Sequence, residues 1–146
     1  MEQSVLRMLD SMMSTTDDPA VSEQLRQHKT ETERHEQSLR GRLEELGRDI
    51  SARKEAQTLA TTLAKGVADQ VRGDKAGKNA RDGYVTEHME IAAYEMLERL
   101  AERAGDQETA EVARRNRADE EAMAQTIPAK WDKSLDLTLG KEGIRT

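Results

Sequence analysis

Hydrophobic positions recur along most of this chain with the period of an α-helix rather than that of a strand. Near the N-terminus, Val5 and Leu9 fall on one stripe of residues 2–14. A turn follows, in which Asp18 can cap the next helix and Pro19 can occupy its first position. The pattern therefore predicts one helix that ends before this turn and a second helix that begins at it.

The same pattern predicts the remaining segments of the chain. The second helix is long and should end at Leu46, because Gly47 follows it. Gly105 and Asp106 mark a similar break between the third and fourth long helices. The later elements expected in chain order are a weaker helix over residues 51–71, a loop over 73–77, helices over 78–104 and 107–127, and a tail over 128–146 with a flexible end from Gly140.

The lengths of the connections predict the topology. Loops of a few residues after the first and third long helices require two antiparallel hairpins. Residues 51–71 form a helix of about 20 residues, which at roughly 1.5 Å per residue reaches back along about 30 Å. We therefore expect an all-α four-helix bundle over residues 1–127, with a long helical crossover between its two hairpins, and a C-terminal tail over residues 128–146.

Composition agrees with a helical domain. The chain has 146 residues, which is enough for one core. Only 2% of residues are aromatic, and straight-chain helix formers dominate. The hydrophobic fraction of 35% beside 36% charged residues is low for a globule, but the regular periodicity argues against disorder.

Charge and residue types exclude several kinds of function. The net charge is -6, and basic residues alternate with acidic ones, so no nucleic-acid partner is expected. No cysteine is present, which excludes disulfides and thiolate chemistry. No segment approaches about 20 uninterrupted apolar residues, so no membrane partner is expected either. These observations predict a soluble, cytoplasmic protein.

Polar residues interrupt the middle of the helix seams, where apolar ones are expected. Burying such groups without partners costs several kcal/mol each. In an antiparallel hairpin, residues equidistant from the turn lie at one level. Glu2 should therefore lie level with Glu31 and His35, and Glu87 and Glu90 should lie level with residues 120–124. Carboxylates and imidazoles on facing helices suit iron or manganese in a two-metal centre. The candidate metal ligands are Glu2, His28, Glu31, His35, Glu87, Glu90 and Glu120.

Four short motifs resemble the YciE/YciF-like stress-response proteins of the ferritin-like superfamily. Residues 2–6 (E-Q-S-V-L) are similar to that family's A-E-x-Q-L-L, and residues 28–32 (H-K-T-E-T) to its H-L-x-E-T. Residues 86–94 (T-E-H-M-E-I-A-A-Y) resemble its V-E-H-Y-E-I-A-x-Y, which is the most specific match. Residues 119–121 resemble the acidic cluster of its fourth helix.

The resemblance runs from Glu2 to about Ile127 and implies a ferritin-like bundle. It implies that Glu2 and Glu87 are the single-glutamate ligands of the first and third helices. Glu90 completes an E-x-x-E spacing like that of rubrerythrin-type members. The implied function is stress protection by peroxide or oxygen chemistry at iron or manganese.

The chain also departs from the superfamily pattern. The usual E-x-x-H of the second helix reads Thr32-x-x-His35, with Glu31 one position early. Met123 stands where a fourth-helix histidine is usual. These departures favour an alternative, in which the bundle holds no metal and serves as a structural or interaction module.

Plainer interpretations compete with these hypotheses. A single acidic residue on a helix is often only solvated, and the methionines usually fill core space. Trp131 and the apolar face of residues 51–71 favour a homodimer or higher homo-oligomer. Residues 135–145 faintly resemble the peptides that load ferritin-like cargo into encapsulin shells, so an encapsulin shell is a further candidate partner.

Overall fold

A computed structural model describes residues 1–47 and 76–144 of this chain. Within those residues the regular elements are helices, with no strand. The expected all-α helical bundle is therefore confirmed. The elements are α1 (Glu2–Thr15), α2 (Pro19–Glu45), α4 (Ala76–Ala104), α5 (Gln107–Thr126), the short 3-10 helix η2 (Pro128–Lys130) and α6 (Trp131–Lys141).

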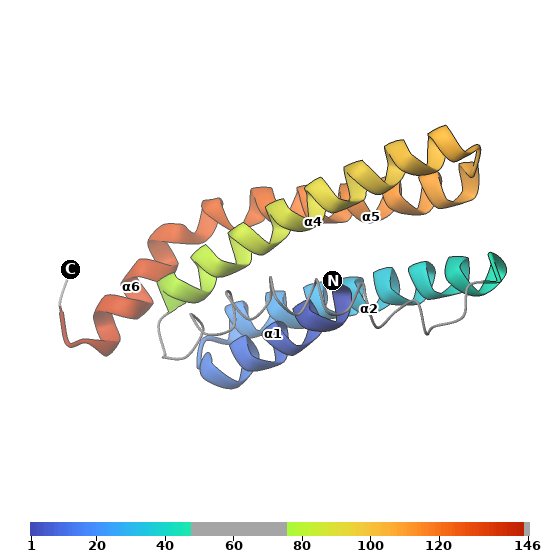
Figure 1. The fold of residues 1–146 in the computed structure, drawn as a ribbon. Coiled ribbons are helices and arrows are strands. Elements are labelled where there is room, and N and C mark those ends of the chain that lie inside the picture. Colours follow the sequence, from blue (N-terminus) through green and yellow to red (C-terminus); the bar gives the residue numbers. More distant parts are fainter. Residues whose placement is uncertain (48–75, 145–146) are drawn as a thin grey trace.

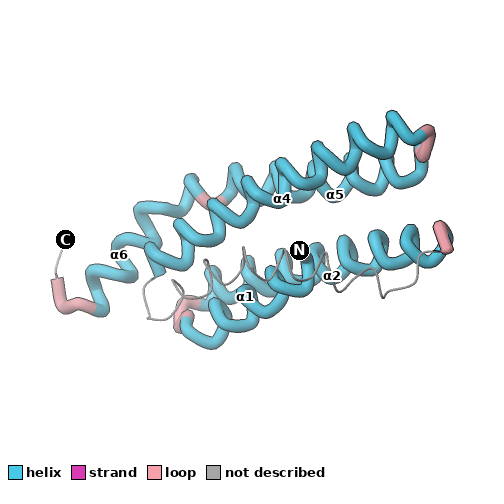
Figure 2. Tube along the Cα trace, in the orientation of Figure 1, coloured by secondary structure: helices cyan, strands magenta, loops and turns pink. Residues whose placement is uncertain are grey.

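The long helices form two antiparallel hairpins, α1 with α2 and α4 with α5 (Figure 1). Figure 2 shows how short the loops between the paired helices are. Helices α2 and α4 run in the same direction, and α2 ends at the opposite end of the bundle from the start of α4 (Figure 1). This is the parallel arrangement that the predicted crossover requires. The predicted helix over residues 51–71 itself lies outside the described residues.

The predicted helix boundaries are confirmed where local sequence determines them. Asp18 Oδ1 accepts hydrogen bonds from the backbone N–H groups of Ala20 and Val21, with Pro19 in the first turn. At the other turn, Asp106 accepts a hydrogen bond from the N–H of Thr109. Gly105 has a φ of 75°, which residues with a side chain rarely adopt.

Two helix boundaries differ from the predictions because of tertiary contacts. Ala76 and Gly77, which were predicted to lie in a loop, begin α4. The N–H of Gly77 donates to Thr138 Oγ1 at 2.9 Å, so α6 supplies a partner that local sequence cannot reveal. The tail also differs from the flexible end expected from Gly140, because α6 continues to Lys141 and lies against the start of α4 (Figure 1).

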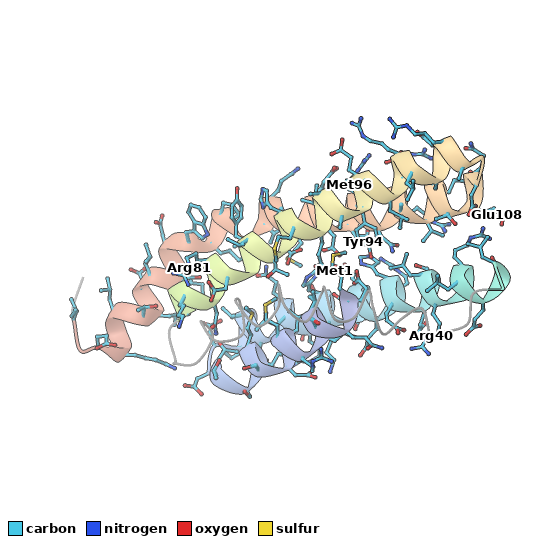
Figure 3. All side chains as sticks on the ribbon, in the orientation of Figure 1. Met1, Arg40, Arg81, Tyr94, Met96 and Glu108 are labelled. Carbon is cyan, nitrogen blue, oxygen red and sulfur yellow. The ribbon has the colours of Figure 1, made fainter. Side chains whose placement is uncertain are left out.

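Few large apolar side chains are buried among the described residues, and four of the nine buried hydrophobic residues are alanines. Leu9 and Met12 are buried in α1, and Tyr94 is buried in α4. The expectation that the methionines fill the core holds for Met12 but is wrong for Met89 and Met96 on the outside of α4, which are 38% and 72% exposed. Figure 3 shows Met96 in this position. The middle of the bundle is instead filled by buried acids and histidines.

Candidate metal centre

Six of the seven predicted ligands come together in the middle of the bundle. Each of the four long helices contributes at least one of them, and α2 contributes two histidines one heptad apart on its inner face. The backbone places them there because residues at heptad spacing share one face of a helix. All six are buried: Glu2, His28, His35, Glu87, Glu90 and Glu120.

The six residues form two overlapping groups. One contains His28, Glu87, Glu90 and Glu120, and the other contains Glu2, His35 and Glu120. Within each group, the potential ligand atoms all lie within 4.8 Å of one another. Glu120 belongs to both groups, so it lies at the centre of the site.

The two carboxylate oxygens of Glu120 face different histidines. Oε1 lies 2.9 Å from His35 Nδ1, and Oε2 lies 4.0 Å from His28 Nε2. His28 Nε2 also lies 3.1 Å from Glu87 Oε1, and His35 Nδ1 lies 4.0 Å from Glu2 Oε2. A carboxylate in this position can bridge two cations, one on each side.

Many of these donor atoms lack a hydrogen-bond partner of normal geometry among the described residues. Neither carboxylate oxygen of Glu90 has a hydrogen-bond partner in the part of the chain that the structure describes. Glu120 lies 2.9 Å from His35, and His28 lies 3.1 Å from Glu87, but these two contacts do not have hydrogen-bond geometry. Most buried polar atoms in folded proteins are paired, because each unpaired one costs free energy. A bound cation would use these lone pairs, so the donor set fits a metal ion.

Surrounding side chains orient two of the candidate ligands. His35 Nε2 lies 3.0 Å from Asp119 Oδ2, which leaves Nδ1 facing Glu120. Tyr94 OH donates a 2.7 Å hydrogen bond to Glu2 Oε1 and accepts one from Asn116 Nδ2. Figure 3 shows Tyr94 between the two hairpins. Such partners of ligands fix ring and carboxylate orientation in metal proteins.

The electrostatics of the site show how crowded the acids are. Burial and the neighbouring acids Glu2 and Glu120 raise the pKa of Glu90 well above its ordinary value. Burial also raises the pKa of Glu87 to about 7, although His28 acts to lower it. For His28, burial acts to lower the pKa, but Glu87 and Glu120 outweigh it and raise the pKa to about 9. The acids therefore hold protons that a cation could replace.

Glu31 is the predicted ligand that the structure leaves outside both groups. Its side chain is 39% exposed, and Oε2 lies 3.6 Å from His28 Nδ1. Thr32, which stands where the usual E-x-x-H motif has its glutamate, is buried, and its Oγ1 donates to the carbonyl of His28. The rotation of α2 therefore places Thr32 inside the bundle and Glu31 at its edge.

Asp119 was not among the predicted ligands, although it is the first residue of the acidic cluster that resembles one in the YciE/YciF-like proteins. It was treated as one of many surface acids, and its side chain is indeed 37% exposed. Its position directly before Glu120 could have identified it. When a helix directs one residue inward, the neighbouring residue can still reach the second ring nitrogen of a histidine ligand, here Nε2 of His35. His88, the remaining histidine, is exposed, and its Nδ1 lies 2.8 Å from the carbonyl oxygen of Tyr84.

The fold and these buried groups define a helical bundle with a candidate two-metal centre. The sequence model of a family described as "Domain of unknown function (DUF892)" matches residues 1–137, and the chain belongs to that family. No curated protein and no solved structure matched the chain. Within the described residues, no helix is both long enough and apolar enough to cross a membrane.

Proposed function

We propose that this chain is a ferritin-like protein that binds two iron or manganese ions between its helices. The observation that carries the proposal is the pair of ligand groups that share Glu120, with unpaired donor atoms in both. His28, Glu87 and Glu90 would hold one ion, and Glu2 with His35 the other. Carboxylates with one imidazole at each ion are a donor set suited to iron or manganese.

The arrangement also answers the main objection from the sequence. Met123 occupies the position where a fourth-helix histidine is usual, which suggested that half of the site was lost. In the structure, His28 of α2 supplies an imidazole to the group that contains Glu87 and Glu90. Each group therefore contains one histidine. The lack of a fourth-helix histidine no longer favours the metal-free alternative.

When bound, iron or manganese in such a site supplies electrons to oxygen or peroxide. The protein holds the ligands in place through Tyr94 and Asp119 and shields them from bulk water by burial. Glu87, whose pKa is raised to about 7, can give up its proton near neutral pH as a cation binds. The likeness to the YciE/YciF-like proteins supports a role in stress protection.

Self-association is a further part of the proposal. Four apolar residues on the outer side of α4 are exposed: Val85, Met89, Met96 and Leu100. A row of apolar residues along one exposed helix face favours contact with a second copy of the chain. The likeness of the tail to encapsulin-loading peptides stays a prediction, and its residues up to Lys141 belong to α6.

Elemental analysis of protein purified without chelator, and again after loading with iron or manganese, tests the proposal. We expect two ions per chain, one for each ligand group. Glu120→Gln should lower occupancy of both sites, because this residue belongs to both groups. Glu121→Gln is the matched control, since Glu121 is exposed beside it. Equal metal contents in the two variants, or no metal in the parent, would refute the proposal.

A further inference from the structure

A largely apolar cavity of about 120 Å³ runs from the surface to the candidate metal centre. Asp17 and Asp18 border it at the turn between α1 and α2, and His28 and Glu87 border it inside. Along α2, the distance from Asp18 to His28 is about 15 Å at roughly 1.5 Å per residue. Apolar lining residues from four helices are Leu9, Met12, Val21, Leu25, Met123 and Leu137.

Small residues on α4 keep this space open. Ala76, Ala80 and Gly83 line it, and their spacing places them on one face of the helix. A Cβ atom added at Gly83 would meet only the side chain of Ile127, at 3.6 Å. Larger side chains at these three positions would fill the cavity. The cavity therefore depends on the small size of these residues.

The inner end of the cavity offers a hydrogen-bond acceptor. Glu87 is 2% exposed, and its Oε2 has no hydrogen-bond partner among the described residues. Glu90 and Glu120 next to it would repel an anionic ligand. His28 at this end is already paired with Glu87 Oε1, at 3.1 Å. The apolar walls cannot solvate a charged ligand. A neutral group that donates a hydrogen bond, such as a hydroxyl or hydroperoxide, satisfies both conditions.

The size of the cavity limits the rest of the ligand. An apolar cavity of roughly 150 Å³ engineered in another protein binds benzene. We propose that this cavity binds a small neutral molecule of the R–OH or R–OOH class, with an apolar body no larger than about a benzene ring and its polar group directed at Glu87. The proposal deepens the proposed function, because it names the substrate class for the metal centre beside the cavity.

Titration of the metal-free full chain with phenol, benzene and benzoate tests the proposal, followed by isothermal calorimetry and by protein NMR. Phenol should bind saturably with one molecule per cavity, and benzoate should not bind. Ala80→Leu should weaken phenol binding by about tenfold or more, because the added side chain takes up the space. Ala122→Leu, on the exposed side of α5, should bind phenol as the parent does.

A second variant tests the hydrogen-bond acceptor at the inner end of the cavity. Glu87→Leu removes the acceptor, so the preference for phenol over benzene should fall by roughly threefold or more. If Ala80→Leu does not fold by circular dichroism, Gly83→Leu fills the same cavity from the next turn. Absence of phenol binding, or equal binding in the filled variant and the control, would overturn the proposal. If the protein binds phenol but no metal, only the metal centre is refuted. If it binds metal but no phenol, only the proposed cavity ligand is refuted.

Discussion

Glu90 is a candidate ligand whose carboxyl group is inaccessible to water and has no hydrogen-bond partner among the described residues. Glu87, by contrast, lies 3.1 Å from His28, so neutralising it would also leave that histidine without its nearest carboxylate. Glu90 is therefore the better position at which to separate the cost of buried charge from its use in metal binding.

Glu90→Gln should stabilise the metal-free protein, by about 1–3 kcal/mol, because the variant removes a buried acid while keeping its shape. The same change should reduce the increase in melting temperature that iron or manganese produces, because a ligand is lost. Melting curves of parent and variant, with and without metal, measure both effects. Glu121→Gln should change stability by no more than about 0.5 kcal/mol, and a destabilised Glu90→Gln would contradict the assignment.

The buried ionisable groups also predict how stability depends on pH. Glu87 and Glu90 have pKa values raised in the folded state, so they reduce stability as pH rises from about 4.5 towards those values. His28 has a pKa raised from 6.5 to about 9, so its stabilising contribution is complete below pH 6.5 and is lost as pH rises to 9. All three groups therefore act in the same direction.

The metal-free protein should accordingly have a lower melting temperature at pH 9 than at pH 6. Glu120, whose pKa is lowered, does not oppose this trend, because its contribution is already constant above pH 4.5. Thermal denaturation in chelator-treated buffers across this range measures the effect, and Glu90→Gln should flatten it. A melting temperature that does not fall between pH 6 and pH 9 would contradict these raised pKa values.

At the scale of the element, helix ends were predictable because their causes are local. Asp18, Pro19 and Gly105 each determine a boundary through their own side chain or backbone. The start of α4 was not predictable, since Gly77 is a poor helix former that becomes helical against Thr138 of α6. The same contact explains why the tail was expected to be less ordered than α6 is.

Two glycines should respond to alanine in opposite directions. Gly41 lies inside α2, and a Cβ there would meet nothing within 4 Å, so Gly41→Ala should stabilise the protein by about 0.5–1 kcal/mol. Gly105 ends α4 with a φ of 75°, so Gly105→Ala should destabilise it by about 1 kcal/mol. Urea denaturation of both variants measures the difference. The same sign for both would show that one of these backbone conformations is wrong.

At the scale of the molecule, hairpin register accounts for how much of the site was predictable. Counting from the two turns placed Glu2 level with Glu31 and His35, and Glu87 level with residues 120–124. The structure brings together Glu2 with His35 and Glu87 with Glu120 in one site. Helix rotation was not determined by that counting, which is why Glu31 was included although Thr32 faces inward. The contact between the two hairpins could not be predicted from the sequence either, because only tertiary packing brings His28 close to Glu87.

The exposed apolar row on α4 leads to a prediction about the whole assembly. Met96 and Leu100 are 72% and 64% exposed and lie one helical turn apart, on the face turned away from the metal ligands. Burying such a row against a second copy would remove apolar area from water on both chains, so we expect a homodimer.

Light scattering over a range of concentrations should therefore give a mass above that of one chain. Met96→Glu places a charge in the row and should weaken the dimer by about tenfold or more, because a buried unpaired charge is costly at an interface. Leu46→Glu, at the exposed end of α2, should leave the mass unchanged. The metal content of Met96→Glu should equal that of the parent, because Met96 contributes to neither ligand group. A parent protein that stays monomeric at high concentration would refute this use of the α4 face while leaving the metal centre untouched.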